Sequence, residues 1–498
     1  MKILLEMRPA LDGHAGIPQA SRLLFRALNL LDDMQVEGLI QSSSSVLARA
    51  LPAQPASTAQ ALPVDQQINR LSRVVVSLQR GAKPKLRERL ASALSLTVAP
   101  SAMLLRHLLG GQQELWRFDP THFRDFIWRS LFARTLPYED FEAVTRAGFR
   151  VARVPWTAMH TVALLTHKLG HAVYPRLDTR DFDVMICETP YPATVSRRTR
   201  LVVRYHDAIP VLMPHTISDK AYHQASHYQA LRRNVASGAH FACVSDATRR
   251  DLVSIFPQVE ERSVTIHNMV SHHYFPETSS PLRVPEIIRT RMHTGVRVRT
   301  DIHQRVEPLM DNNGATPFAY LLMVSTIEPR KNHATLLAAW EQLRTERFPQ
   351  LKLVIVGMLG WDHRAIVAKF RPWLERGELF MLEDVPAGEL RLLYRHARAT
   401  VCPSFGEGFD FSGVEAMRCG GAVVASDIAV HRDVYGDAAQ YFNPYAAQQA
   451  AMAIAQLIDP SEPARQLELV GRGAKVSKRY LPEVILPQWR AFLQQLRT

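Results

Sequence analysis

Short apolar runs alternate with helical patterning in the C-terminal part of the chain, and this alternation restricts the fold more than any other feature. Most of the runs are followed by apolar residues that repeat at helical spacing. Strands that alternate with helices build a parallel sheet with helices on its faces. We therefore expect a doubly wound α/β domain over about 316–478. Its predicted strands lie at 320–324, 353–357, 379–382, 399–402 and 422–425.

The N-terminal part begins with the same kind of signal. A short apolar strand at 2–6 runs into a loop that contains Gly13 and Gly16, and helical spacing follows. These features predict a second Rossmann-like domain over 1–300, joined to the first by a charged linker at 301–315. Further predicted strands of this domain lie at 184–187, 201–203 and 241–244.

Two segments stand apart from this rhythm. Residues 44–175 begin with a stretch rich in Ser, Ala, Pro and Gln and then have no strand–helix alternation, so we interpret them as a helical insertion in the N-terminal domain. The last segment, 479–498, carries Trp489 and Phe492 at helical spacing. It is expected to form a helix that can cross back to the N-terminal domain.

Composition limits where the protein works and what it binds. The 60 Lys and Arg outnumber the 47 Asp and Glu, which gives a net charge of +13 and favours either nucleic acid or an acidic membrane surface. No nucleic-acid recognition module is visible, so that partner is not expected. The four cysteines are far apart and there is no signal peptide or apolar span of about 18 residues. These features predict a reduced, cytoplasmic protein.

The most informative loop joins a predicted strand to a predicted helix at 404–417. Its glycines at 406, 408 and 413 let the backbone approach a ligand, and the start of the helix offers free N–H groups to an anion. Glu407 and Glu415 are spaced so that one can reach a sugar and the other a ribose. Acids also favour an ordinary helix N-terminus, because the helix dipole attracts them. Spacing alone leaves both interpretations open.

A second loop carries adjacent cations at the carboxyl end of a predicted strand. Arg330 and Lys331 precede a predicted helix from Thr335 to Leu343. Two positive side chains in this position are suited to a diphosphate, although a solvated basic turn has the same pattern. A second loop of this kind in the same domain favours the diphosphate.

These residues resemble the retaining glycosyltransferases of family 4, which have the GT-B fold. The resemblance covers about 316–445 and rests on the Glu-Pro-Arg-Lys-Asn run, the paired-glutamate loop and the later Ala-Met-Arg-Cys-Gly run. The N-terminal part is similar over 201–270, where the His-Asp-Ala-Ile-Pro run at 206–210 occurs. The segment 44–175 has no counterpart that we recognise.

The resemblance implies roles for individual residues. Arg330 and Lys331 would bind the diphosphate of a nucleotide-sugar donor, Glu407 would face the transferred sugar and Glu415 would hold the ribose. Gly16 would offer a backbone N–H across the cleft. The resemblance also implies a site at the anomeric centre formed by His206 and Asp207, and a donor loop formed by Gly408, Phe409, Asp410 and Phe411.

The sequence differs from the family pattern at one place, and it contains one motif that resembles a metal site of other enzymes. The family commonly has Gly-Leu-Pro where this chain has Asp410, Phe411 and Ser412. Since a carboxylate beside a diphosphate repels it, we hypothesise that Asp410 reads a hydroxyl of the donor hexose. The Asp-Phe-Asp run at 181–183 imitates a metal-binding motif, but it precedes a strand and so lies at the wrong sheet end for a donor site. No metal and no cofactor are expected.

The function implied is retaining hexose transfer, with mannose from GDP-mannose as the first donor, to a saccharide or lipid-linked glycan acceptor in polysaccharide or lipopolysaccharide synthesis. A basic, amphipathic stretch at 67–110 suits peripheral contact with the anionic inner face of the cytoplasmic membrane, or equally a helix packed on its own domain. Two alternatives remain open: a non-catalytic nucleotide-sugar-binding subunit of a glycan assembly complex, and a GT-B sugar-nucleotide epimerase.

Overall fold

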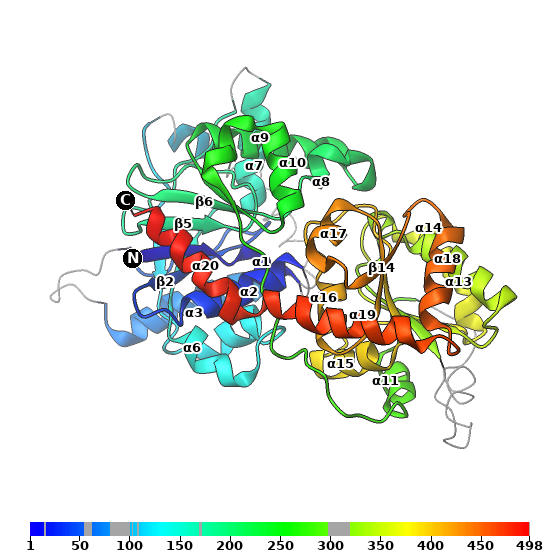
Figure 1. The fold of residues 1–498 in the computed structure, drawn as a ribbon. Helices are drawn as coiled ribbons and strands as arrows, with labels where there is room; N and C mark the ends of the chain where they lie inside the picture. The colour runs from blue at the N-terminus through cyan, green and yellow to red at the C-terminus, as the bar shows by residue number, and fades with distance from the viewer. Residues whose placement is uncertain are drawn as a thin grey trace.

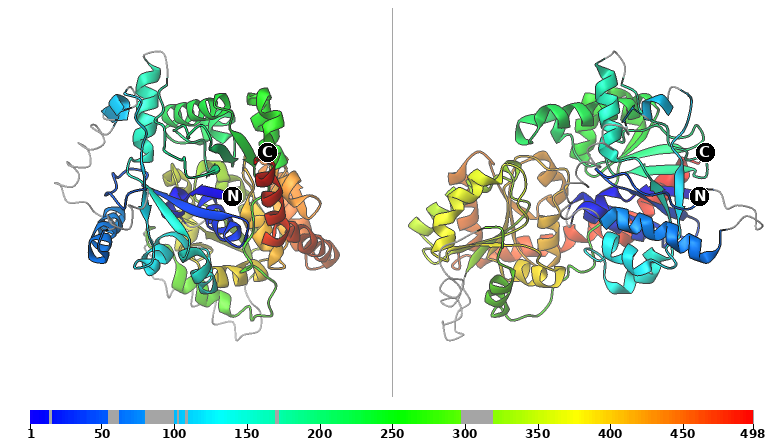
Figure 2. Two further views of the ribbon diagram at one scale, coloured as in Figure 1. Left: turned by 90° about the vertical axis from the view of Figure 1, so that its left-hand side faces the viewer. Right: turned by 180° about the vertical axis from the view of Figure 1, so that it is seen from behind.

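A computed structural model describes two Rossmann-like domains that lie side by side (Figure 1). The residues described are 1–13, 16–53, 62–79, 100–101, 103–106, 109–168, 172–296 and 319–497. Each domain has one sheet of mainly parallel strands, with helices on both faces and apolar clusters between the layers (Figure 2).

The sheet of the N-terminal domain has the strand order β3-β4-β2-β1-β5-β6-β7-β8. The order reverses between β1 and β5, which pair in parallel. Its strands are β1 (Lys2–Glu6), β2 (Gln35–Gln41), β3 (Leu115–Phe118), β4 (Gly148–Ala152), β5 (Val184–Cys187), β6 (Arg200–Tyr205), β7 (His240–Cys243) and β8 (Ser263–Thr265). Its helices are α1 (Arg8–Asp12), α2 (Ile17–Leu28), α3 (Val64–Gln79), α5 (Arg124–Ile127), α6 (Phe141–Thr145), α7 (Trp156–His167), α8 (Ile209–Leu212), α9 (Lys220–Ala236) and α10 (Asp246–Ile255).

The interpretation of residues 44–175 as a helical insertion is wrong in part. The segment supplies β3 and β4, and β4 extends the sheet by pairing in parallel with β2. The edge strand β3 is antiparallel to β4. Both strands are short, and β3 places Trp116 and Arg117 at half-buried positions, so neither gives a clear apolar run.

The sheet of the C-terminal domain has the order β11-β10-β9-β12-β13-β14, and all of its strands are parallel. The order reverses between β9 and β12. Its strands are β9 (Tyr320–Val324), β10 (Lys352–Val356), β11 (Leu379–Leu382), β12 (Ala399–Cys402), β13 (Val423–Ser426) and β14 (Ala439–Phe442). Its helices are α13 (His333–Glu346), α14 (His363–Glu375), α15 (Ala387–His396), α16 (Phe411–Arg418), α17 (Ala429–Tyr435), α18 (Ala447–Ile458) and α19 (Pro463–Val476), and a short 3-10 turn, η6 (Pro329–Lys331), follows β9.

The expected domain boundary at residue 300 is wrong, because the chain enters the C-terminal domain earlier. Helix α11 (Arg283–Arg291) buries Val284 and Ile288 in the same apolar cluster as Leu382 of β11. Met292 then pairs with Leu382 in an isolated bridge. Charged residues interrupt the apolar pattern of α11, so its buried face could not be recognised from the sequence. The expected linker at 301–315 lies outside the described residues.

The last helix returns to the N-terminal domain. Helix α19 lies along the C-terminal domain, and after η7 (Ser477–Tyr480) α20 (Pro482–Gln495) runs over the N-terminal domain (Figure 1). Trp489 is fully buried in the apolar cluster that also contains Phe25 of α2. Arg490 forms an ion pair with Asp33 at 3.2 Å. The helix therefore ties the two domains together.

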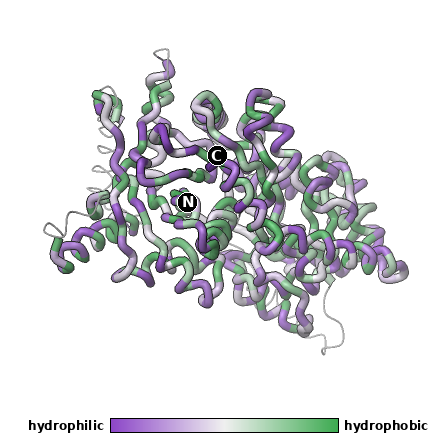
Figure 3. The backbone as a smooth tube through the Cα atoms, turned by 60° about the vertical axis from the view of Figure 1, so that its left-hand side comes forward, coloured by the Kyte–Doolittle hydropathy of each residue, from purple (hydrophilic) through white to green (hydrophobic). Residues whose placement is uncertain are grey.

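The buried apolar residues of α3 face the protein, whereas Val64 and Val76 are exposed. Leu71 and Val74 are buried in the core of the N-terminal domain, whereas Arg73 is exposed. For residues 67–79 the structure therefore shows a basic helix packed on its own domain; residues 80–99 of the basic stretch lie outside the described part. Along the backbone tube, hydrophobic and hydrophilic residues alternate over short distances (Figure 3). Among the described helices, none is both long enough and apolar enough to cross a bilayer.

Candidate active site between the domains

The two loops singled out in the sequence lie side by side at the reversal point of the C-terminal sheet. Strands β9 and β12 are paired through Leu322 and Thr400, so the loops that follow them leave the sheet at neighbouring positions. Ligands of open parallel sheets bind outside the carboxyl ends of the strands at such a reversal. The fold thus brings Arg330, Lys331 and Glu407 together from segments more than 70 residues apart.

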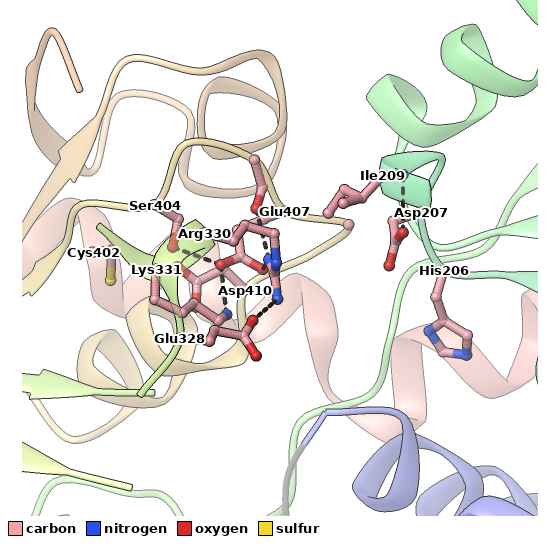
Figure 4. Close-up of polar contacts among 12 residues, drawn as sticks. His206, Asp207, Ile209, Glu328, Arg330, Lys331, Cys402, Ser404, Glu407 and Asp410 are labelled. Carbon is pink, nitrogen blue, oxygen red and sulfur yellow. Dashed lines mark hydrogen bonds and ion pairs between the residues drawn. The ribbon is translucent and has the colours of Figure 1, made fainter. Parts of the chain in front are cut away.

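These three side chains form a compact charged cluster (Figure 4). The Glu407 carboxylate accepts one hydrogen bond from Arg330 Nη1 at 2.8 Å and another from Lys331 Nζ at 2.5 Å. Arg330 also donates to the Gly406 carbonyl at 2.7 Å and to Glu328 Oε1 at 2.8 Å. Since the protein's own groups hold each cation in place, the cluster is preorganised.

Burial and charge set the ionisation of this cluster. Burial opposes the ionisation of Glu407, but the charges of Arg330 and Lys331 outweigh it and hold its pKa below the ordinary value. Burial raises the pKa of Glu328, which Arg330 only partly offsets. Although burial disfavours its charge, Arg330 has a raised pKa because Glu407 and Glu328 face it. Arg330 therefore stays charged and, together with Lys331, can bind an anionic ligand beside Glu407.

The N-terminal domain faces this cluster with the loop after β6. Asp207 and Arg330 line the same cavity of about 200 Å³, together with Ile209 and Trp361. Asp207 Oδ1 accepts the backbone N–H of Ile209 at 3.0 Å, which fixes its carboxylate at the start of α8. Figure 4 shows Asp207 and His206 on the side opposite Arg330 and Lys331. The site is therefore built from both domains.

His206 belongs to a buried network that the sequence did not reveal. Its Nε2 lies 3.0 Å from Glu188 Oε2, and Arg204 Nη1 lies 3.4 Å from the same oxygen. Burial opposes the ionisation of Glu188, but Arg204 and His206 outweigh it and lower its pKa. An ionised carboxylate can only accept, so His206 carries its proton on Nε2 and leaves Nδ1 as an acceptor. Burial lowers the pKa of His206, which keeps the ring neutral at pH 7.

A backbone contact closes the two domains on one another. A Cβ built on Gly408 would lie 1.8 Å from the carbonyl oxygen of His206, so the two main chains touch across the domain boundary. Thr248 Oγ1 also donates to the Gly408 carbonyl at 3.3 Å. Gly16, the other predicted glycine, precedes α2 with a φ of 70° and has open space around it. Its conformation favours glycine and leaves the start of α2 accessible.

Glu415 lies at the domain boundary, on α16. Its Oε1 accepts a hydrogen bond from Gln19 Nε2 of the N-terminal domain at 2.9 Å, and its Oε2 accepts one from Tyr394 at 3.1 Å. Burial raises the pKa of Glu415 to about 7, although these hydrogen bonds oppose the shift. Gln19 therefore binds the carboxylate that the resemblance assigns to a ribose. The sequence did not indicate this contact.

The remaining residues of the predicted donor loop mainly support its shape. The Phe409 ring is buried against Tyr480 and Phe411, with centroids about 5.1 Å apart in both pairs. Asp410, at a φ of 61°, accepts hydrogen bonds from Ser412 Oγ at 2.7 Å and from His431 Nε2 at 3.0 Å. Because both carboxylate oxygens already have partners, the geometry favours a role in holding the loop over the hypothesised reading of a hexose hydroxyl.

The Asp-Phe-Asp run has structural partners. Asp183 Oδ2 accepts the backbone N–H of Lys2 at 2.8 Å, and Asp181 lies 3.3 Å from Arg150. The run precedes β5, so it lies at the sheet end opposite to His206. Among the described residues, no group of three or more His, Cys, Asp or Glu side chains is arranged to hold a metal ion.

Comparisons with known proteins point to one class of enzyme. The sequence family described as glycosyl transferases group 1 matches residues 310–472. O-antigen chain mannosyltransferase B of Escherichia coli is 27% identical over 317 residues, which cover 63% of this chain and 75% of that protein. The serotype-specific mannosyltransferase WbdA of Escherichia coli is 37% identical over 135 residues, but these cover 27% of this chain and only 16% of WbdA.

A solved structure supports the architecture over the whole chain. HepE from Anabaena, in complex with UDP and glucose, superimposes with a TM-score of 0.57 at 14% identity and covers 99% of each chain. At this identity the similarity speaks for the fold alone. It confirms the expected arrangement of two Rossmann-like domains facing a cleft.

Proposed function

We propose that this protein, which is a glycosyltransferase with the GT-B fold, transfers mannose from GDP-mannose with retention of configuration, as family 4 enzymes do. The proposed acceptor is a saccharide or lipid-linked glycan of cell-surface polysaccharide synthesis. The observation that carries the proposal is the Arg330–Glu407–Lys331 cluster at the strand reversal, which shares a cavity with Asp207 of the opposite domain. The similarity of this chain to bacterial mannosyltransferases supports mannose as the transferred sugar.

The donor diphosphate binds between the two domains. Arg330 and Lys331 take the phosphates from one side, and the N-terminus of α2 beside Gly16 offers free backbone N–H groups from the other. As the glycosidic bond breaks, negative charge grows on the departing diphosphate, and fixed cations in a site shielded from water stabilise it. The reaction therefore needs no metal ion to offset that charge.

Glu407 and His206 face the sugar from opposite sides. Glu407 holds the two cations in place, and the remaining acceptor positions of its carboxylate bind hydroxyls of the hexose. His206, neutral and protonated on Nε2, presents its ring beside the anomeric carbon. The leaving phosphate takes the proton of the acceptor hydroxyl on the face from which it departs, which yields retention without a covalent intermediate.

Release of nucleoside diphosphate from a panel of nucleotide sugars tests the proposal. We expect the wild-type protein to release GDP from GDP-mannose faster than any other nucleotide from its sugar conjugate, and a crude glycolipid fraction to raise the rate. Nucleotide release from UDP-sugars alone would contradict the donor assignment. Binding of GDP-mannose without any release would favour a non-catalytic subunit.

Glu188 offers a specific test of how His206 is oriented. Glu188→Ala removes the acceptor of the His206 N–H, whereas Arg204 keeps its hydrogen bonds to Asn268 and to the Ala20 carbonyl. The proton of His206 should then no longer be held on Nε2, and kcat should fall by about a hundredfold, as expected when a supporting carboxylate is lost. Nitrogen NMR of the ring checks the tautomer. A fall in kcat with the tautomer unchanged would contradict this positioning role.

The raised pKa of Glu415 leads us to expect that donor binding depends on pH. Only the ionised carboxylate can accept two ribose hydroxyls, and burial raises the pKa of Glu415 to about 7. The donor KM should therefore fall as pH rises from 6 to about 8, whereas Glu415→Gln should give a higher KM with a flat profile. GDP-mannose is suitable for the titration because both of its phosphates are esterified. A wild-type KM that is constant over this range would contradict the role.

We also propose that the enzyme works in the cytoplasm, in peripheral contact with an anionic membrane. The net charge of +13 and exposed cations such as Arg73 on α3 support electrostatic attraction to acidic lipid. Because the apolar residues Leu71 and Val74 of α3 are committed to the core, insertion of that helix into the bilayer is not part of the proposal.

A further inference from the structure

A second cavity, of about 460 Å³, lies within the N-terminal domain and shares no lining residue with the cavity that contains Asp207 and Arg330. Gln41 and Ala152, the last residues of β2 and β4, form part of its wall. Strand β3 is antiparallel and begins opposite Ala152, so Trp116 lines the cavity from the same edge. Because β2, β4, β5 and β6 are parallel, the cavity opens at the sheet edge at which Glu188 and His206 also lie.

Three arginines surround this cavity. Arg49 follows β2, Arg153 follows β4, and Arg106 comes from the segment before β3. Within the described residues none of the three has a carboxylate partner, and Glu114 is the one acid in the described lining. Burial and the nearby charge of Arg49 both lower the pKa of Arg153. Like charges around a hollow repel one another unless an anion lies between them.

The rest of the lining combines apolar groups with these cations. Met103, Val154 and Leu177 contribute apolar surface. The guanidinium carbon of Arg49 lies 5.8 Å from the centroid of the Trp116 ring, so this indole also reports on the cationic part of the cavity. A planar guanidinium group binds a phosphate through two parallel hydrogen bonds. The lining therefore suits a phosphate joined to a sugar or a hydrocarbon.

We propose that this cavity binds a phosphate or diphosphate group of the glycosyl acceptor through Arg49, Arg106 and Arg153. The inference rests on the proposed function and adds the chemical class of the acceptor. The donor phosphates bind to Arg330 and Lys331 of the other domain, so the two anion sites are separate. An acceptor phosphate held here leaves the sugar end of the acceptor at the sheet edge that carries Asp207 and His206.

Tryptophan fluorescence of the full chain, titrated with inorganic pyrophosphate, tests the site. We expect pyrophosphate to change the fluorescence of the wild type. Trp116→Phe should remove this change, except for any signal from Trp361 beside the donor site. Arg49→Gln and Arg49→Gln/Arg153→Gln should raise the dissociation constant measured through Trp116 by at least about tenfold, since each removes charged hydrogen bonds. Arg49 is exposed, so its single substitution leaves the fold intact.

The matched control is Arg197→Gln/Arg198→Gln, which removes the same charge. Both side chains are exposed between β5 and β6, at the opposite sheet edge. This variant should bind pyrophosphate like the wild type. Equal affinity in the wild type and Arg49→Gln/Arg153→Gln, or a fluorescence change that persists fully in Trp116→Phe, would overturn the proposal.

Two further ligands separate the sources of the phosphate. Tighter binding of farnesyl diphosphate than of mannose 1-phosphate supports a lipid-linked acceptor, and the reverse order supports a sugar phosphate. Cleavage of GDP-mannose by the same preparations reports on the proposed function independently. Cleavage without pyrophosphate binding at Trp116 overturns the acceptor site alone. Pyrophosphate binding without cleavage of any nucleotide sugar overturns the assignment of this cavity to a glycosyl acceptor.

Discussion

Lys331→Ala is expected to lower kcat by about two to three orders of magnitude and to raise the dissociation constant of GDP-mannose by less than about tenfold. The reason is that the negative charge of the diphosphate increases only as the glycosidic bond breaks. Before the bond breaks, the diphosphate shares Lys331 with the Glu407 carboxylate, which already contacts it at 2.5 Å. As the bond breaks, charge grows on the leaving diphosphate, and the loss of a fixed cation is felt most in the transition state.

Single-turnover rates and donor affinity, measured on the same variant, check this prediction. Lys369→Ala is the matched control, because it removes an exposed lysine from α14 in the same domain and should match the wild type. Lys331→Arg keeps the charge and should retain more activity than Lys331→Ala. Parallel losses in kcat and affinity would mean that Lys331 binds the ground state and the transition state equally well.

Gly408→Ala should abolish productive domain closure. The new Cβ would lie 1.8 Å from the His206 carbonyl oxygen, a backbone atom that cannot move without shifting the loop of the N-terminal domain. The clash is relieved when the two domains move apart, so the variant should fold and keep its melting temperature. We expect kcat/KM to fall by at least about a hundredfold, which corresponds to roughly 2.7 kcal/mol.

The matched control for this variant is Gly388→Ala. Gly388 lies in α15, and a Cβ built there has nothing within 4 Å. It should therefore keep wild-type kinetics, and steady-state rates with thermal unfolding of both variants make the comparison. Wild-type activity in Gly408→Ala would mean that the two main chains do not need to touch during the reaction.

The parts of the site that could be predicted are those set by short sequence distances. Arg330 and Lys331 lie in the loop after one strand and Glu407 lies in the loop after another, so the positions of these loops follow from the strand–helix alternation. Their convergence required that β9 and β12 be neighbours although β10 and β11 lie between them in the sequence, as happens where the strand order of a doubly wound sheet reverses. The resemblance then supplied the roles that spacing alone left open.

The parts that could not be predicted depend on pairing between distant segments. Gln19 and Glu415 are hydrogen-bonded although 396 positions separate them, and no local pattern marks Gln19. Glu188 had one signal, a charged residue placed directly after the buried strand β5, but only the fold shows that it contacts His206. Strands β3 and β4 were missed because their burial depends on the neighbouring β2 more than on their own apolar pattern.

The most direct test of the account is a crystal structure of the protein with a non-hydrolysable analogue of GDP-mannose. The account predicts that the diphosphate lies between Arg330, Lys331 and the N-terminus of α2, that the ribose hydroxyls contact Glu415 in place of Gln19, and that the hexose lies between Glu407 and His206. A diphosphate bound away from Arg330 and Lys331, or a hexose on the outer face of either domain, would contradict it.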